Sequence, residues 1–276
     1  MIIPAAGRMT AAGAEVLEGH MRLTKFGAPS LRSSTGPPIT APISCSLLAF
    51  GPPLVMFALT IANDPVRIII MIAAAFGWLV AFLLASILWY AVWPLRSYLA
   101  FGMVFAIIIQ EAFRYGMYRL LRRTEAGLKI ISENCEVNNH KLGIAYVSGL
   151  GFGTMSGAFA LVNVLADSVG PGSLGLNGGT EFFFVTSAAM TLCMILLNTF
   201  WSVIFFNGFD EKNYYKVLWV IGSHFLVSGL SLLNKKELYA ATILPSYIVL
   251  IITAVIAFKC AGGTKQSLLQ SFSNRI

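Results

Sequence analysis

Charged residues are scarce in this 276-residue chain: Asp, Glu, Lys and Arg together make up 11%, whereas 57% of the residues are hydrophobic. A soluble domain carries about 25% charged residues, so this composition excludes an ordinary water-soluble protein. The four cysteines show no paired spacing, which indicates neither a disulfide framework nor a zinc site. The zinc-protease pattern H-E-x-x-H and the N-glycan acceptor Asn-x-Ser/Thr are both absent. We therefore expect a polytopic membrane protein without a cofactor.

Long apolar runs recur along the chain and are separated by short connections. Backbone groups in lipid have no water to bond, so helices must carry these runs across the membrane. The fold class we expect is all-α, a bundle of seven transmembrane helices. The predicted spans are Ser44–Asn63, Val66–Trp93, Tyr98–Leu121, Gly143–Asp167, Glu181–Asn207, Tyr214–Asn234 and Tyr239–Phe258.

Lysine and arginine are distributed unevenly over the predicted connections. With the N-terminus outside, twelve of the nineteen fall on the cytosolic side, mainly in the segment from Arg114 to Lys141. The positive-inside rule therefore favours an outside N-terminus and a cytosolic C-terminus. This bias, together with anionic lipid at the cytosolic surface, accounts for the net charge of +7 without nucleic-acid binding.

Three segments differ in composition. Residues 1–42 are rich in Gly, Pro, Ser and Thr and are expected to form a disordered extension. They contain no apolar core of the kind a secretory signal requires, and Glu15 and Glu18 weaken the alternative of a transit peptide. Residues 43–267 are expected to form the seven-span domain, and residues 268–276 a short cytosolic tail.

A glycine repeat lies within the fourth predicted span. Gly149, Gly153 and Gly157 recur every four residues, so they line one shallow face of a helix. Lipid supplies almost no hydrophobic force between helices, and such a face lets two backbones approach closely. The repeat therefore predicts helix packing, either against a neighbouring helix of this chain or against another subunit.

Few ionisable groups fall inside the spans, and each is a candidate for function. Glu111 and Arg114 stand three residues apart, which predicts an internal ion pair on one helix face. His224 lies near the middle of the sixth span, where it either bonds to another helix or lines a polar cavity. Asp64, followed by Pro65, is typical of a helix N-cap.

Intramembrane catalysis by this chain alone is not supported by these residues. An aspartyl protease needs two aspartates within the membrane, whereas the aspartates here stand at span ends. A serine protease would need a nucleophile beside a base, and nothing in the sequence joins Ser156 to His224. One alternative remains from another class: a channel or small-solute transporter with Glu111, His224 and Asn198 along a polar path.

Several ordered motifs resemble one family, the anterior pharynx-defective (Aph) subunit of gamma-secretase. The resemblance covers roughly residues 44–267. It rests on AFGPPLVMFAL (49–59), NDPVRIII (63–70), QEAFRYGMYRLLRR (110–123), YVSGLGFGTMSG (146–157), LADSVGPG (165–172) and GSHFLVSGL (222–230), which occur in the family's order.

The resemblance implies a non-catalytic scaffold in the gamma-secretase complex, an intramembrane aspartyl protease that processes single-span proteins such as Notch-type receptors and amyloid precursor-type proteins. It implies presenilin, nicastrin and the presenilin enhancer subunit as partners, and the endoplasmic reticulum, Golgi and plasma membrane as locations. The catalytic aspartates would belong to presenilin. Gly149, Gly153 and Gly157 match the family's glycine repeat and would serve helix packing and assembly.

Three departures from the family pattern concern the polar residues and the outer surface. His224 matches one of two intramembrane histidines of the family, whereas Asn198 stands where the family usually has the other. Asn can form hydrogen bonds but cannot become a cation. The turn at residues 94–97 is shorter than the family's outer loop, and residues 1–42 are extra.

Overall fold

The computed structural model describes residues 40–92, 99–131, 137–169, 181–232 and 239–263. These residues form seven helices, and no strand occurs among them. The helices are α2 (Thr40–Thr60), α3 (Pro65–Ala91), α4 (Leu99–Ile131), α5 (Val137–Val169), α6 (Glu181–Asp210), α7 (Tyr214–Ser231) and α8 (Tyr239–Cys260). The predicted all-α class is therefore confirmed for the described residues, while residues 1–39, the 94–97 turn and the 268–276 tail lie outside them.

Five of these helices are long and apolar enough to cross a membrane: α2, α3, α5, α6 and α8. The other two carry polar groups that lower their hydropathy: α4 contains Glu111 and Arg114, and α7 contains Lys216 and His224. The protein is thus a multi-pass membrane protein. The count of seven spans remains a prediction.

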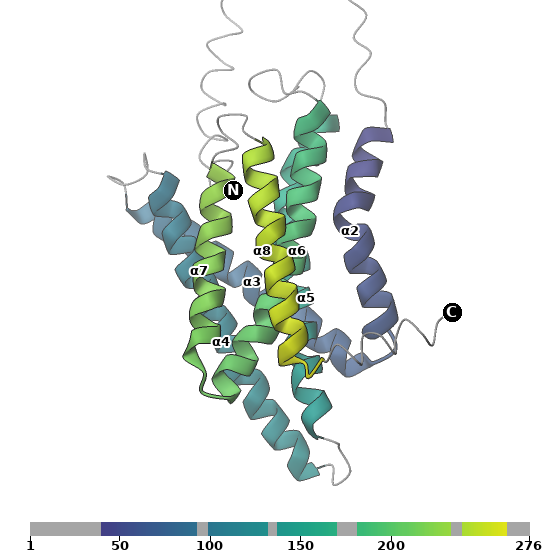
Figure 1. Ribbon diagram of the computed structural model, residues 1–276, viewed down its shortest axis with the longest axis vertical. Coiled ribbons are helices and arrows are strands. Elements are labelled where there is room, and N and C mark those ends of the chain that lie inside the picture. The colour runs from purple at the N-terminus through teal and green to yellow at the C-terminus, as the bar shows by residue number, and fades with distance from the viewer. Residues whose placement is uncertain (1–39, 93–98, 132–136, 170–180, 233–238, 264–276) are drawn as a thin grey trace, which may run out of the picture.

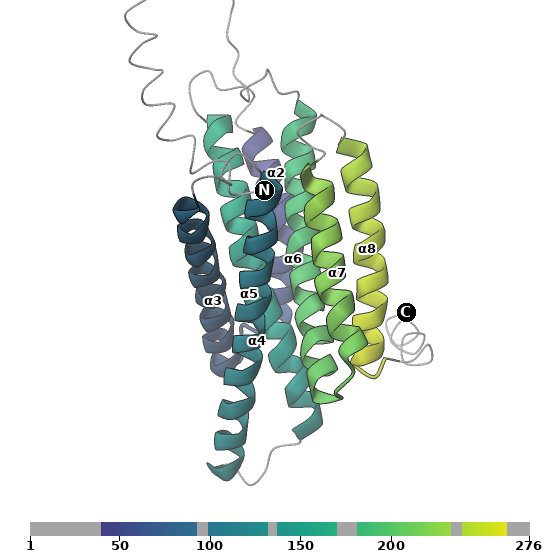
Figure 2. The ribbon, with the colours of Figure 1, turned by 90° about the vertical axis from the view of Figure 1, so that its left-hand side faces the viewer.

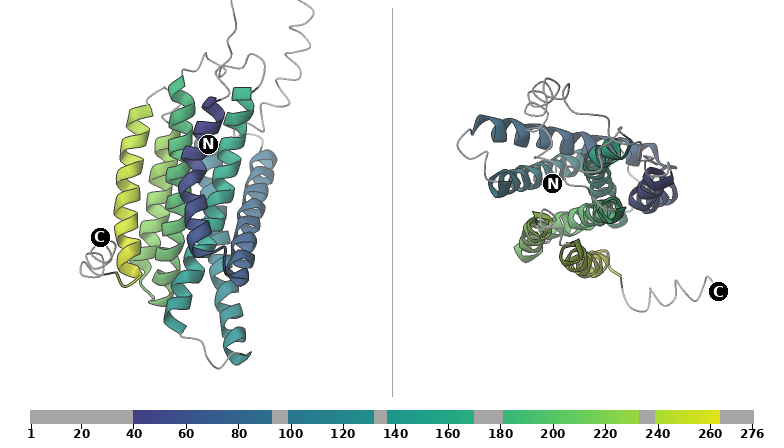
Figure 3. Two further views of the ribbon diagram at one scale, coloured as in Figure 1. Left: turned by 90° about the vertical axis from the view of Figure 1, so that its right-hand side faces the viewer. Right: turned by 90° about the horizontal axis from the view of Figure 1, so that it is seen from above.

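The helices run side by side, and α4 and α5 extend past their neighbours at one end of the bundle (Figure 2). We call this end the lower end, as Figure 1 draws it; the turn from α2 to α3 and the turn from α6 to α7 both lie there. Seen from above, α3 and α8 lie at opposite margins and α3 is strongly tilted (Figure 3).

Helix α6 is the centre of the bundle. It contacts α2, α5, α7 and α8, and it is the most buried of the five apolar helices. Large side chains of α6 are fully enclosed, among them Trp201, Ile204 and Phe206. Residues on the outer helices instead expose large apolar side chains, as expected where lipid is the solvent.

The start of α3 shows how the sequence sets a helix end. The Asp64 carboxylate accepts hydrogen bonds from the backbone N–H groups of Val66 and Arg67, at 3.0 and 3.4 Å, and Pro65 takes the first helical position. Arg67 closes the turn by pairing with Asp64 at 3.1 Å and donating to the Thr60 carbonyl at 2.7 Å. The predicted N-cap is confirmed.

Candidate functional site: a buried polar cluster beside a glycine seam

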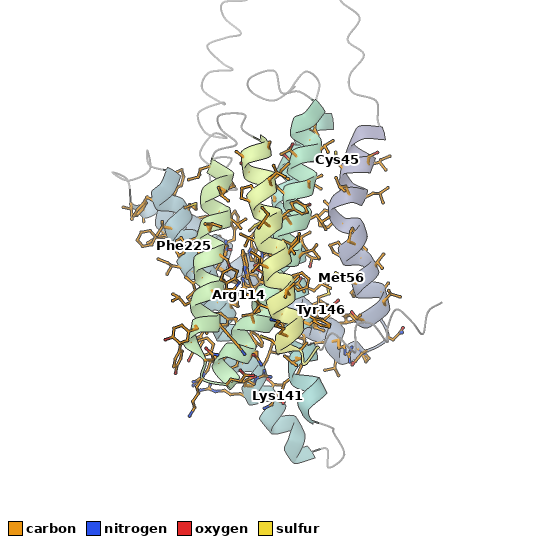
Figure 4. All side chains as sticks on the ribbon, in the orientation of Figure 1. Cys45, Met56, Arg114, Lys141, Tyr146 and Phe225 are labelled. Atoms are coloured by element: carbon orange, nitrogen blue, oxygen red, sulfur yellow. The ribbon has the colours of Figure 1, made fainter. Side chains whose placement is uncertain are left out.

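The ion pair expected between Glu111 and Arg114 is present and lies inside the bundle. Arg114 Nε is 3.0 Å from Glu111 Oε2, and the two side chains are only 1% and 7% exposed. The pair belongs to α4, but α6 and α7 enclose it, and Arg114 lies at the middle of the bundle in Figure 4. A charge removed from water is tolerated only when it is paired and hydrogen-bonded, and the surroundings supply both.

All five N–H donors of Arg114 have acceptors. Nε and Nη2 donate to Glu111, at 3.0 and 3.3 Å. Nη1 donates to the Asn198 carbonyl at 3.1 Å and to Ser202 Oγ at 2.6 Å, and Nη2 donates to Asn198 Oδ1 at 2.8 Å. The guanidinium can make five such bonds, so this one is saturated and joins α4 to α6.

His224 completes the cluster from α7. Its Nδ1 lies 2.7 Å from Glu111 Oε1, and the ring is 2% exposed. The imidazole stacks on Trp201 of α6 with ring centroids 4.6 Å apart. The carboxylate of Glu111 therefore has a partner for each oxygen, and the four predicted polar residues, Glu111, Arg114, Asn198 and His224, meet in one place.

Helix α5 borders the same cluster. Asn198 Nδ2 donates to the Met194 carbonyl at 2.9 Å and lies 3.4 Å from Ser156 Oγ, which itself donates to the Gly153 carbonyl at 2.8 Å. The Phe152 ring lies 4.9 Å from Arg114 Cζ, a cation–π distance. We name Glu111, Arg114, Asn198, Ser202 and His224 the polar cluster.

The glycine repeat lies directly beside the cluster and faces α6 of the same chain. A Cβ on Gly149 would lie 2.7 Å from the Thr199 carbonyl oxygen, and one on Gly153 would lie 2.6 Å from that of Ile195. A Cβ on Gly157 would meet Ile195 Cδ1 at 2.5 Å. A side chain at Gly149 or Gly153 would meet the α6 backbone and push the helices apart, whereas one at Gly157 would meet the end of the Ile195 side chain. The three glycines together form a seam between α5 and α6.

A fourth glycine has a separate role that the repeat did not predict. A Cβ on Gly151 would collide with the Met71 carbonyl oxygen of α3. Gly151 lies on the other side of α5 from the seam, so α5 is held closely between α6 and α3. The spacing of Gly149 and Gly151 indicates close packing on both sides of α5, because two glycines two residues apart occupy opposite faces of a helix.

Other residues around the cluster were not singled out from the sequence. Ser202, Trp201 and Phe152 surround Arg114, yet a serine, a tryptophan and a phenylalanine in apolar spans carry no specific signal. Their role depends on how α5 and α6 are rotated against α4, which periodicity alone does not fix.

Two smaller groups of polar residues join helices at the lower end. Arg122 of α4 pairs with Asp210 of α6 and with Glu125 at 2.9 Å. Lys216 of α7 lies 2.6 Å from both Asn207 Oδ1 and Glu211 Oε2. The hydrogen bond from Lys216 is the main reason that the pKa of Glu211 lies below its ordinary value.

This geometry defines a class: a multi-pass membrane protein whose central helices are joined by a saturated polar cluster and a glycine seam. The family model of the Aph-1 protein matches residues 40–264. The chain belongs to the Aph-1 family.

Curated relatives cover most of both chains. The gamma-secretase subunit Aph-1 of Drosophila melanogaster is 60% identical over 223 residues, which are 81% of this chain and 93% of the relative. The gamma-secretase subunit Aph-1b of Danio rerio is 43% identical over 233 residues, or 81% and 90% of the two chains. The gamma-secretase subunit APH-1B of Homo sapiens is 41% identical over 233 residues, again 81% of this chain and 90% of the relative. The predicted resemblance is confirmed, and the relatives support a component of gamma-secretase.

Proposed function

We propose that this chain is a non-catalytic scaffold subunit of gamma-secretase, and that it stabilises the complex that cuts single-span membrane proteins such as Notch-type receptors and amyloid precursor-type proteins. The observation that carries the proposal is the 60% identity to a gamma-secretase subunit over 93% of that subunit's length. A relative that similar along nearly its whole chain leaves little room for a different fold or a separate activity.

The roles of the titratable groups support a non-catalytic chain. Asp64 caps α3 and Asp210 pairs with Arg122, so each of these aspartates serves the structure. Ser156 bonds within its own helix and His224 is bonded to Glu111, so the two do not form a nucleophile and base. In the proposed complex, the catalytic aspartates are those of presenilin.

The polar cluster and the glycine seam suit a scaffold. Helices in lipid gain little by burying apolar surface, so a defined bundle needs close packing and bonds between helices. Here both devices converge on α6. We propose that they give the chain a rigid frame on which presenilin, nicastrin and the presenilin enhancer subunit assemble, and that the effect of Gly149, Gly153 and Gly157 on assembly is transmitted through this frame.

The proposed topology has seven spans, an outside N-terminus and a cytosolic C-terminus. Its support is the excess of Lys and Arg on the connections at the lower end, together with helices at every predicted span. We further propose that the complex resides in the endoplasmic reticulum, the Golgi and the plasma membrane.

The experiment is a purification of the tagged full-length chain from its native membranes in mild detergent, followed by mass spectrometry of the bound proteins. We expect presenilin and nicastrin homologues in stoichiometric amounts. Recovery of the chain alone or as a homo-oligomer would contradict the proposal.

A second measurement addresses the channel or transporter alternative. The purified chain is placed in liposomes and ion flux is recorded without partners. The scaffold proposal expects no flux above that of empty liposomes, because the donors of Arg114 and the oxygens of Glu111 are already engaged within the chain. Flux that disappears in Glu111→Gln would instead establish the alternative.

A further inference from the structure

A cavity of about 280 Å³ lies between α4, α6 and α7, next to the polar cluster. Its walls are almost entirely apolar. They include Ile108, Ala112 and Tyr115 from α4, Phe209 from α6, and Val217 and Phe225 from α7. Glu111 also touches the cavity, but its oxygens are bonded to Arg114 and His224.

The cavity opens to the outside of the bundle. Ile108 is 50% exposed and Tyr115 is 39% exposed, and both lie on its walls. An opening on the lipid-facing surface admits an apolar ligand from the membrane directly. We name this cavity, with its opening between α4 and α7, the α4–α7 groove.

Cations stand at the lower end of the groove. Arg119 follows Tyr115 by one helical turn, and its Nη1 donates to the Tyr115 hydroxyl at 3.5 Å. Lys212 lies in the turn that follows Phe209, and its backbone N–H donates to the Phe209 carbonyl at 3.3 Å. Arg119 therefore contacts a groove-lining aromatic residue through its side chain, and the backbone of Lys212 bonds to that of another, which places one basic residue on each side.

These two cations are not neutralised by any residue that the structure describes. Among the described residues, neither Arg119 nor Lys212 forms an ion pair, and both are exposed. The nearby acids are already engaged: Asp210 pairs with Arg122, and Glu211 pairs with Lys216. The mouth of the groove therefore has a positive charge that an anionic group can complement.

The backbone at Lys212 adds an independent observation. Its φ is +55°, in the left-handed region that favours glycine, and it is the single non-glycine residue with positive φ among the described residues. Glycine would adopt this backbone conformation with less strain, so the presence of lysine indicates a role for its side chain. A required positive charge at this position is such a role.

From these observations we propose that the α4–α7 groove binds an anionic phospholipid, with one acyl chain along the cavity and the headgroup phosphate at Arg119 and Lys212. This site goes beyond the scaffold function. It uses the proposed orientation, which places the lower end at the cytosolic leaflet, where anionic lipids are concentrated.

The dimensions fit one leaflet. From Ile107 to Arg119 helix α4 rises ~18 Å at 1.5 Å per residue, and half of a bilayer's hydrocarbon core is ~15 Å thick. A cavity of about 280 Å³ has room for part of an acyl chain, and the rest of the chain would lie along the exposed surface.

The test uses the purified full-length chain and, separately, the complex recovered with it. A phosphatidylserine probe with a photoreactive group on one acyl chain is cross-linked, and the labelled residues are mapped by mass spectrometry. The same probe with a phosphatidylcholine headgroup is the lipid control. We expect phosphatidylserine labels concentrated on 107–115 and 217–225, and phosphatidylcholine labels spread over all exposed helices.

Two sets of variants separate the headgroup from the acyl chain. Arg119→Gln and Lys212→Gly should each reduce phosphatidylserine labelling of the groove by roughly fivefold, and Lys259→Gln, an exposed cation at the end of α8, should not. Lys212→Gly also removes backbone strain, so lost labelling cannot be attributed to unfolding. Ala112→Trp fills the groove and should abolish labelling there, whereas Ala73→Trp on the exposed face of α3 should leave it unchanged.

Three results would overturn the proposal. Groove labelling that is equal for the two headgroups and unchanged in Ala112→Trp would reveal only the general lipid layer around the bundle. Competition by water-soluble glycerophosphoserine at millimolar concentration would reveal a headgroup site without an acyl chain. Cross-links from the groove to another subunit in the assembled complex, with the lipid labels gone, would assign the groove to a protein segment.

Discussion

The imidazole Nδ1 of His224 and the carboxylate Oε1 of Glu111 lie 2.7 Å apart, although the two residues are 113 positions apart in the chain. Glu111 is paired with Arg114, so its carboxylate is ionised and can only accept. Nδ1 must therefore carry the proton and donate. This one hydrogen bond selects the tautomer of His224 and ties α7 to the ion pair on α4.

Replacing His224 with phenylalanine should remove this hydrogen bond and keep an aromatic ring against Trp201. We expect a loss of about 2 kcal/mol in the free energy of unfolding, since a hydrogen bond to a charged group contributes about 1.5–3 kcal/mol. The measurement is reversible unfolding of the purified chain in mixed micelles, monitored by circular dichroism.

A double-mutant cycle provides the control for this prediction. In a Glu111→Gln background the partner of His224 is no longer charged, so His224→Phe should have an effect smaller by at least 1 kcal/mol. An unchanged effect of His224→Phe in that background would mean that the residue stabilises the bundle through stacking on Trp201 alone.

The glycine seam gives a second prediction. Gly153→Ala places a Cβ 2.6 Å from the Ile195 carbonyl oxygen, so α5 and α6 must separate, and overpacking of this kind typically destabilises by about 1–3 kcal/mol. Gly222→Ala is the matched control, because nothing lies within 4 Å of a Cβ there. The control should be neutral or slightly stabilising, since alanine favours a helix over glycine by about 1 kcal/mol.

Leucine at the same two positions tests the role of the seam in assembly. Membrane insertion of both variants is expected to be normal, because it depends on the hydropathy of the spans. Recovery of partner subunits with Gly153→Leu should fall severalfold, and with Gly222→Leu it should not. Recovery of a full-size complex with Gly153→Leu would show that assembly does not depend on the seam.

The existence of the helices could be predicted from the sequence, but some of their ends could not. Apolar runs located all seven, and Asp64-Pro65 set the start of α3 within one residue of the prediction. Helix α4 continues to Ile131 although the apolar run stops at Leu121, and α5 begins at Val137 before the predicted Gly143. Hydropathy marks where a segment is apolar, whereas a helix continues into polar surroundings as long as its backbone bonds are made.

The polar cluster was predictable only in part. An i,i+3 spacing was enough to predict the pair of Glu111 and Arg114, because both lie on one helix. The contacts from Arg114 to Asn198 and Ser202 join residues at least 84 positions apart, and they depend on the rotation of α6 relative to α4. The seam fixes the rotation of α6 relative to α5 through close backbone contact, so the glycines contribute only indirectly to which polar residues meet.

Asn198 is expected to contribute more to the stability of the bundle than a buried hydroxyl on the same helix. Asn198→Leu removes one of the two acceptors of Arg114 Nη2 and leaves one buried N–H of a charged group unpaired, so we expect a loss of about 2–3 kcal/mol. Thr199→Val is the comparison, because the Thr199 hydroxyl bonds only to the Ile195 carbonyl of its own helix. Equal effects of the two substitutions in chemical unfolding would contradict a special role for Asn198.

Replacing one member of the ion pair should destabilise the protein more than replacing both. Arg114→Leu leaves the carboxylate of Glu111 buried with only His224 as a partner, and such a change typically costs about 3–5 kcal/mol. Glu111→Leu together with Arg114→Leu removes both charges, and replacement of a buried pair by apolar groups is often neutral or stabilising. We therefore expect the double variant to unfold at a higher denaturant concentration than Arg114→Leu. If the double variant is the less stable of the two, Glu111 stabilises the bundle without Arg114, through its hydrogen bond with His224.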